Sequence, residues 1–315
     1  MLESLETGWG LDVVLWLQER RTGLLDALAG ATDFAGDTLF FLAILPIFLW
    51  CIDKNLGRRM LFTLMVTGVV SYFLKALFDR PRPFEVAPEQ VERLVSASQG
   101  GIPSGHTMVS LAVWGVLAIW VAQRYPARRG LAWGLLAAYV VLMGLSRMYN
   151  GVHYPQDVVA GIFFAGIILA GVLPFEAWAA PRWFGLPPMA RVGLGVMVWV
   201  ISVALIWDNS DALALLATLA GGVVAMVLDR TRIGFSPAGP PAQRAARYIA
   251  GLILLVGAFL LMDSAFEPLE PAPIWRALRY GITGFLALAG IPWLFVRLGL
   301  APRDLTPRPG QPGYG

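Results

Sequence analysis

Charged residues, cysteines and histidines are all scarce in this chain of 315 residues. Asp, Glu, Lys and Arg make up 14% of it, against about 25% in a typical soluble domain, and hydrophobic residues make up 57%. This balance excludes an ordinary soluble protein and predicts one that lies in a bilayer. The single cysteine, Cys51, excludes an intramolecular disulfide. The net charge of +3 is too small to indicate a nucleic-acid partner.

Long stretches of low charge recur along the chain, and a transmembrane helix needs about 20 residues of this kind. They predict an all-α fold, a polytopic membrane bundle of about nine transmembrane helices. The expected spans are 35–52, 59–78, 106–123, 130–147, 156–178, 190–207, 211–228, 247–264 and 278–297.

The connecting segments alternate between basic and acidic. This alternation predicts their side of the membrane, because basic loops stay in the cytoplasm. The basic segments contain Lys54, Arg58, Arg59, Arg124, Arg128, Arg129, Arg182, Arg191, Arg230, Arg232, Arg244, Arg247, Arg297, Arg303 and Arg308, and the acidic ones contain Asp208, Asp211, Asp263, Glu267 and Glu270. We therefore expect a protein of the plasma or inner membrane with its N-terminus outside and its C-terminus in the cytoplasm.

The N-terminal segment, residues 1–34, precedes the first expected span. Over residues 8–29 apolar positions such as Trp9 and Val14 alternate with charged ones, which predicts an amphipathic helix on the outer surface. A soluble helix that leads into the first span is the alternative. Glu3 and the lack of a long apolar core before Asp12 are not typical of a cleavable signal peptide.

Three further regions are expected after this segment. Residues 35–180 form a helix bundle that contains every motif described below. Residues 181–302 form a four-helix membrane extension, whose sequence has no histidine, cysteine or lysine. Residues 303–315 are rich in Pro and Gly and are expected to form a disordered tail.

Both histidines of the chain lie in motifs that contain small and basic residues. His106 ends the sequence Pro-Ser-Gly-His, and His153 lies between Arg147 and Asp157 in Ser-Arg-Met-Tyr-Asn-Gly-Val-His-Tyr-Pro-Gln-Asp. Upstream of both histidines, Lys75 is followed after six residues by Arg82 and Pro83. Histidine is the usual side chain for moving protons near neutral pH. We therefore expect both to serve catalysis.

The three segments, in this order, resemble the signature of the type-2 phosphatidic acid phosphatase family, the lipid phosphate phosphatase superfamily. Its pattern is Lys-x6-Arg-Pro, then Pro-Ser-Gly-His, then Ser-Arg-x5-His-x3-Asp. The match runs from Lys75 to Asp157, about a quarter of the chain, with no position missing. Nine spans with an external N-terminus are similar to its glucose-6-phosphatase and sphingosine-1-phosphate phosphatase branches, whereas the simpler bacterial lipid phosphatases of the family have six.

The resemblance implies a catalytic role for three of the matched residues. His153 would attack phosphorus and form a covalent phosphohistidine. Asp157 would accept the ring N–H of His153 and fix its tautomer. His106 would act as the general acid that protonates the departing oxygen. The proline at position 155 suits the first turn of a helix.

The remaining matched residues would bind the phosphoryl group. Ser104 and Gly105 are expected at a helix N-terminus, where free N–H groups bind anions. The three cations of the signature would clamp the oxygens as negative charge develops on phosphorus, and they are Lys75, Arg82 and Arg147. Arg80 does not fit the family spacing and is assigned to the rim of the site or to lipid headgroups. No carboxylate cluster for a divalent metal accompanies the motifs, so we expect hydrolysis without a metal or another cofactor.

The loop charges place all three motifs on the outer face of the membrane. The segment 84–102 between the first two is expected to be a short interfacial helix over the site or a plain solvated loop. The sequence thus predicts an integral-membrane phosphatase that hydrolyses a lipid phosphomonoester or diphosphate, such as phosphatidate, a polyprenyl diphosphate or a long-chain base phosphate. One alternative is a glucose-6-phosphatase-like enzyme acting on a soluble sugar phosphate, and another is a lipid-phosphate transporter. Vanadate-dependent haloperoxidases share the motifs, but nine spans argue against that activity.

Overall fold

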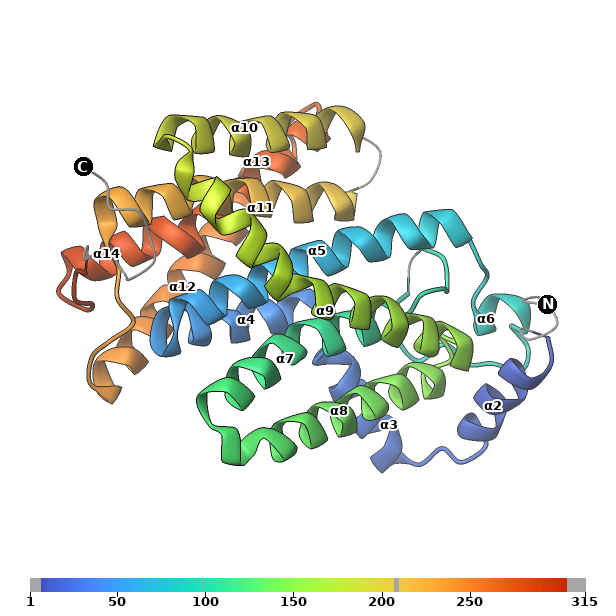
Figure 1. Ribbon diagram of the computed structural model, residues 1–315. Coiled ribbons are helices and arrows are strands. Elements are labelled where there is room, and N and C mark those ends of the chain that lie inside the picture. The colour runs from blue at the N-terminus through green and yellow to red at the C-terminus, as the bar shows by residue number, and fades with distance from the viewer. Residues whose placement is uncertain (1–6, 98, 207–209, 305–315) are drawn as a thin grey trace. The chain divides into compact units, whose positions relative to one another are not determined.

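The computed structural model describes residues 7–97, 99–206 and 210–304, and most of these residues lie in helices (Figure 1). Within these ranges the only β-type pairing is an isolated bridge between Phe235 and Arg303. The all-α prediction is therefore confirmed. Residues 305–315 of the expected tail and Asp208 of the acidic loop lie outside the described residues.

The helices group into two compact units made of discontinuous segments. One unit comprises Met1–Leu42 and Val66–Val172, and the other comprises Ala43–Met65 and Leu173–Gly315. Every residue of the three motifs belongs to the first unit. The expected domain limits at residues 35, 181 and 303 stay predictions.

The first unit contains the N-terminal pair of helices and all or part of four long helices. Its elements, some of which run on into the second unit, are α2 (Trp9–Gln18), α3 (Gly23–Phe34), α4 (Thr38–Ile47), α5 (Lys54–Phe78), α6 (Pro83–Val86), α7 (Gly105–Arg124), α8 (Arg129–Tyr149) and α9 (Pro155–Gly185). Small residues allow the long helices to pack closely. A Cβ on Gly115 of α7 would lie 2.4 Å from Cδ2 of Leu169 in α9, and one on Gly144 of α8 would lie 2.6 Å from Cγ1 of Val158. Helices α7 and α8 are thus held against α9, which starts in the third motif.

The second unit contains the C-terminal helices. Its elements are the π-helical turn η1 (Phe48–Ile52), α10 (Pro188–Leu205), α11 (Ser210–Leu228), the π-helical turn η3 (Asp229–Ile233), α12 (Pro241–Phe266), α13 (Ala272–Phe285), the π-helical turn η4 (Leu286–Gly290) and α14 (Ile291–Arg297). The charge of Asp229 is buried in this unit, where it pairs with Lys54 at 3.0 Å and with Arg58 at 2.5 Å.

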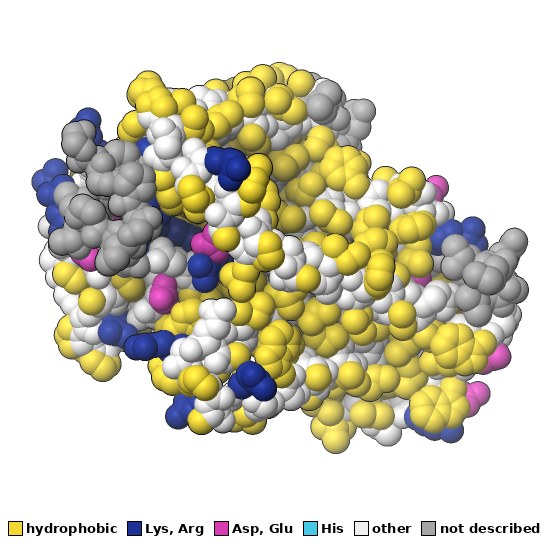
Figure 2. Space-filling view, in the orientation of Figure 1, with side chains coloured by type: hydrophobic (Ala, Val, Ile, Leu, Met, Phe, Trp, Pro, Cys, Tyr) yellow, Lys and Arg dark blue, Asp and Glu magenta, His cyan; other side chains and the backbone are white. Residues whose placement is uncertain are grey.

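Seven helical segments of the described residues are long and apolar enough to cross a membrane. They are Lys54–Val86, Gly105–Arg124, Pro126–Tyr149, Pro155–Gly185, Asp211–Ile233, Pro241–Phe266 and Ala272–Arg297. The bent pair Gly23–Phe34 and Leu39–Ile52 makes an eighth if it counts as one span, and α10 is a shorter apolar helix. The visible face over α8 is largely hydrophobic (Figure 2), with exposed Leu131 and Leu135. The chain is an integral membrane protein, and the count of nine spans stays a prediction.

Two local expectations need correction. The helix expected over residues 8–29 is divided into α2 and α3, because the Thr22 side chain accepts the Leu25 N–H over 3.3 Å and caps a new helix. Its position on the outer surface stays a prediction. In the segment 84–102 the helical residues end with α6 at Val86, so the interfacial-helix alternative is wrong within the described residues. The segment is a loop, as the other alternative has it, but it is not solvated throughout, because Val91 is buried in a hydrophobic cluster.

Candidate active site

Lys75 and Arg82 lie on either side of the turn that follows α5, and both are buried. The Lys75 ammonium donates to the carbonyl of Gly100 over 2.6 Å. The Arg82 guanidinium donates to the carbonyls of Gln99 at 3.1 Å, Val152 at 2.7 Å and Gly100 at 3.4 Å. One short stretch of backbone thus brings the two cations of the first motif together, and Val152 connects them to the third motif.

The second motif begins α7 beside these cations. Ser104 is the N-cap residue, but its side chain makes no capping hydrogen bond, and its backbone N–H donates to the carbonyl of Asp157 over 2.9 Å. A Cβ on Gly105 would lie 3.2 Å from Oγ of Ser71 and 3.8 Å from Cε of Lys75. Glycine therefore lets the start of α7 approach α5, next to the ammonium group. A helix N-terminus in this position favours an anion.

His153 and Asp157 lie at the start of α9, and both are almost fully buried. Nδ1 of His153 is 3.2 Å from Oδ2 of Asp157, which also accepts the Tyr154 N–H over 2.9 Å. On the other side of the ring, Nη1 of Arg82 is 3.3 Å from Nε2. An arginine can only donate a hydrogen bond, so Nε2 is the acceptor and Nδ1 carries the proton that points to Asp157. Pro155 is the first residue of the helix, as expected.

The surroundings of His153 keep its imidazole neutral. Burial lowers the pKa of His153 well below its ordinary value, and the positive charges of Arg82, Lys75 and Arg147 lower it further. Nε2 therefore stays unprotonated at neutral pH, and its lone pair accepts the Arg82 N–H until a phosphoryl group replaces it. A neutral imidazole among cations is suited to attack on an anionic phosphoryl group.

His106 lies in the first turn of α7, next to the turn between α3 and α4. Its Nε2 is 3.5 Å from Oδ1 of Asp37 and 3.9 Å from Oδ1 of Asp33. A Cβ on Gly36 would lie 2.4 Å from Cδ2 of the ring, so this turn is in close contact with the imidazole. Neither aspartate belongs to a motif, and neither is predicted as a site residue from the sequence. The available signal is Asp33 itself, since an acidic residue in a strongly apolar segment usually has a partner.

Arg147 lies in the last turn of α8 and is 2% exposed. Its Nη1 forms an ion pair with Asp33. Its Nε is buried and has no hydrogen-bond partner in the described part of the chain. Buried donors are normally satisfied, so this N–H is available for an anion.

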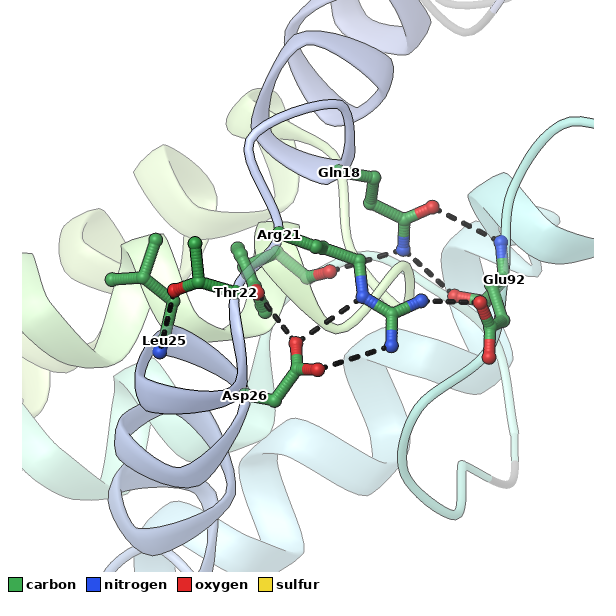
Figure 3. A network of polar contacts seen from close by, with 7 residues as sticks. Gln18, Arg21, Thr22, Leu25, Asp26 and Glu92 are labelled. Carbon is green, nitrogen blue, oxygen red and sulfur yellow. Dashed lines mark hydrogen bonds and ion pairs between the residues drawn. The ribbon is translucent and has the colours of Figure 1, made fainter.

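A cluster of polar residues fixes the corner between α2 and α3 (Figure 3). The Gln18 amide donates to the carbonyls of Glu92 at 2.7 Å and Tyr149 at 3.0 Å, and it accepts the Glu92 N–H at 3.0 Å. Arg21 pairs with Asp26 at 3.2 Å and also with Glu92. The Tyr149 hydroxyl donates to Asp26 over 2.5 Å. The N-terminal helices are therefore attached to the loop after α6 and to the end of α8, at Tyr149 of the third motif.

The eight expected site residues lie in one region of the first unit, linked directly or through a shared partner: Lys75, Arg82, Ser104, Gly105, His106, Arg147, His153 and Asp157. Their individual roles stay predictions. Arg80 is half-buried, and its carbonyl accepts the Gly101 N–H over 2.7 Å. Its assignment to the rim is likewise a prediction. No group of three or more His, Cys, Asp or Glu side chains in the described ranges is placed to hold a metal ion.

Two family models match the chain. Residues 56–180 match the PAP2 superfamily, and residues 213–303 match the transmembrane extension of PAP2 superfamily phosphatases. The first range includes all eight expected site residues. It does not include Asp33 or Asp37.

Individual relatives are phosphatases of phosphorylated lipids by name. The chain is 29% identical over 143 residues to sphingosine-1-phosphate phosphatase 2 of Mus musculus, covering 45% of this chain and 40% of that protein. It is 23% identical over 306 residues to sphingosine-1-phosphate phosphatase 1 of Rattus norvegicus, covering 84% and 70%. It is 30% identical over 158 residues to phosphatidylglycerophosphatase B of Bacillus subtilis, covering 49% and 72%. The match thus spans only about two fifths of the mouse relative's length.

Proposed function

Because the chain belongs to the PAP2 superfamily, we propose that it is a phosphoric ester hydrolase that removes a phosphoryl group from a lipid phosphomonoester or diphosphate at the outer face of its membrane. The observation that supports this most strongly is the ring of His153, held between Asp157 on Nδ1 and Arg82 on Nε2. This arrangement directs a neutral nitrogen towards a group of buried cations.

In the first step, Nε2 of His153 attacks phosphorus while the bond from phosphorus to the lipid oxygen breaks. The departing oxygen takes a proton from His106. The imidazole becomes positively charged as the phosphorus–nitrogen bond forms, and Asp157 stabilises that charge through Nδ1–H. The products of this step are the dephosphorylated lipid and a phosphohistidine.

In the second step, water attacks the phosphohistidine. His106 accepts a proton from the water, the phosphorus–nitrogen bond breaks, and His153 returns to its neutral form. Inorganic phosphate leaves, and His106 is protonated again, now with the proton it took from water. The two histidines thus complete a cycle without another proton carrier.

The three cations act on the oxygens of the phosphoryl group. Lys75 and Arg82 donate to backbone carbonyls, which an anion can replace as partners, and Arg147 has an unpaired Nε–H. Ser104 and Gly105 add the N-terminus of α7. Donors fixed in advance stabilise the negative charge of the five-coordinate phosphorus without reorganisation.

We propose that the substrate is a phosphorylated lipid that is built either on a long-chain base or on glycerol. Relatives named for sphingosine-1-phosphate and phosphatidylglycerophosphate support this class. The motif residues lie at or next to the ends of helical segments of spanning length, so the reacting group lies close to the depth of lipid headgroups. A lipid can reach that depth from within the bilayer.

Phosphate release by the purified protein tests the proposal. The panel comprises phosphatidate, undecaprenyl diphosphate, sphingosine-1-phosphate and glucose-6-phosphate, with His153→Ala as the control. We expect release from at least one lipid, little from the sugar phosphate, and none from the variant. Release from glucose-6-phosphate alone would favour the soluble-substrate alternative. Binding of lipid phosphates without any release would favour a transporter.

Cysteine labelling tests the side of the membrane. In a Cys51→Ala background, Glu89→Cys is exposed in the loop of the site and Ala242→Cys is exposed at the start of α12. A membrane-impermeant maleimide should label the first in intact cells and the second only after permeabilisation. The opposite pattern would place the site on cytoplasmic-leaflet lipids.

A further inference from the structure

We propose that Asp33 is a positioning residue of the active site, which holds Arg147 and lies near His106, from a helix outside the matched family range. The inference rests on the proposed function, since it assigns to Asp33 an effect on the same phosphoryl transfer. Nothing in the three sequence motifs indicates it. Asp33 is 42 positions before Lys75, the first motif residue.

The first observation is the burial and pairing of the carboxylate. Asp33 is 8% exposed, and one of its oxygens, Oδ1, pairs with Nη1 of Arg147 and lies 3.9 Å from Nε2 of His106. A single buried oxygen atom therefore contacts one expected phosphate ligand and approaches the expected general acid. A carboxylate that only stabilised the fold would not have to lie beside both of these expected site residues.

The second observation is the way α3 is attached to α8. The Ser146 hydroxyl donates to the carbonyl of Ala29 over 2.8 Å, and the Tyr139 hydroxyl donates to that of Ala35 over 3.1 Å. These two bonds lie on either side of Asp33 along the chain. The carboxylate is therefore presented to Arg147 by a helix that is itself fixed, and its position does not depend on the ion pair alone.

The third observation is the state of the guanidinium. Asp33 pairs with Nη1 and so fixes one end of the planar group, whose Nε–H is buried without a partner in the described residues. Without the carboxylate, Arg147 is free to turn towards backbone carbonyls, as the other two site cations do. Asp33 thus keeps the Nε–H of Arg147 in a position from which it can donate to a phosphoryl oxygen.

The experiment compares Asp33→Asn with Asp26→Asn in the purified full-length protein. Asp26 lies on the same helix and also pairs with an arginine, Arg21, and its partners Arg21 and Tyr149 are not among the eight expected site residues. Asp33→Asn should lower kcat/KM roughly 10- to 100-fold, less than the roughly 10²–10³-fold typical of losing a direct transition-state contact. Asp26→Asn should stay within about threefold of the wild type.

Two further measurements separate positioning from a folding defect. The inhibition constant for vanadate, which resembles the five-coordinate phosphorus, should rise with Asp33→Asn. A loss of folded molecules would lower the rate but leave that constant unchanged. In an Arg147→Lys background, Asp33→Asn should change kcat/KM by less than about threefold, because residues that act as a unit are not additive.

The outcomes distinguish this inference from the proposed function. If the wild type turns over and His153→Ala does not, the proposed function holds, and the Asp33 variants are then decisive. Full activity of Asp33→Asn, an unchanged vanadate constant, or an equal loss in the Arg147→Lys background would overturn the role of Asp33. An inactive wild type, or one that vanadate does not inhibit, would count against the proposed function instead.

Discussion

Both units of the molecule bury positive charge, but they surround it differently. In the second unit, Asp229 lies between Lys54 and Arg58, and its other oxygen accepts the Phe235 N–H over 2.9 Å. Arg247, fully buried, donates to four backbone carbonyls, those of residues 50, 236, 237 and 238. These contacts join segments that are distant in sequence, and no histidine occurs in this unit.

In the first unit, three buried cations share two buried carboxylates and a neutral imidazole. Lys75 and Arg82 donate to carbonyls of one loop, and Arg147 pairs with Asp33. An unpaired Nε–H is not the distinguishing feature, because Arg247 has one as well. What differs is His153, whose acceptor nitrogen faces a cation. Buried charge alone therefore does not distinguish the proposed site from the rest of the protein, whereas the oriented histidine among the buried charges does.

The largest expected effect is that of His153→Ala. Removing a covalent nucleophile commonly costs roughly 10⁴-fold or more in rate, so phosphate release should fall to the background level. The variant should keep the elution volume and thermal unfolding of the wild type in detergent. Substantial turnover by the folded variant would show that the first unit uses another nucleophile.

The second prediction is a loss of stability, without a loss of activity, from a substitution in the second unit. Asp229→Asn leaves two cations of the second unit with a neutral partner, and breaking a buried ion pair costs about 3–5 kcal/mol. The unfolding temperature should fall clearly, while the rate per folded molecule stays close to that of the wild type. A large loss of rate in molecules that remain folded would mean that the second unit takes part in catalysis.

A third prediction separates two neighbouring arginines. Arg82→Ala should lower kcat/KM by roughly 10²–10³-fold, because a transition-state contact is lost. Arg80→Ala should mainly slow substrate capture, by less than about tenfold. Steady-state kinetics on the same lipid substrate measures both. The reverse order would show that the register of the Arg-Pro motif is wrong by two residues.

These contrasts also show what the sequence can and cannot predict. The spacing from His153 to Asp157, with a proline between them, is local and leads directly to the observed pair at the start of α9. The pairing of Asp33 with Arg147 depends on how α3 packs on α8, and no spacing rule connects these positions. The break between α2 and α3 rests on one capping threonine, Thr22, in a pattern that otherwise continues.

The smallest effect concerns stability at low pH. The pKa of His153 in the folded protein lies well below its ordinary value, so the unfolded chain binds a proton near pH 6.5 that the folded protein does not. The free energy of unfolding should therefore fall as the pH drops below 6.5, by up to about 1.4 kcal/mol per pH unit from this group. His153→Ala should lose less stability than the wild type between pH 7.5 and pH 5.5. An equal loss would contradict a neutral, buried His153.

The most direct test of the central claim is to trap the intermediate. Purified wild-type protein is mixed with a lipid phosphate whose phosphoryl group is labelled, and the reaction is stopped within milliseconds in alkali, where phosphohistidine survives. We predict label on the peptide that contains His153 in the wild type and none in His153→Ala. Phosphate release by the wild type without any labelled histidine, or label that persists in His153→Ala, would contradict the account.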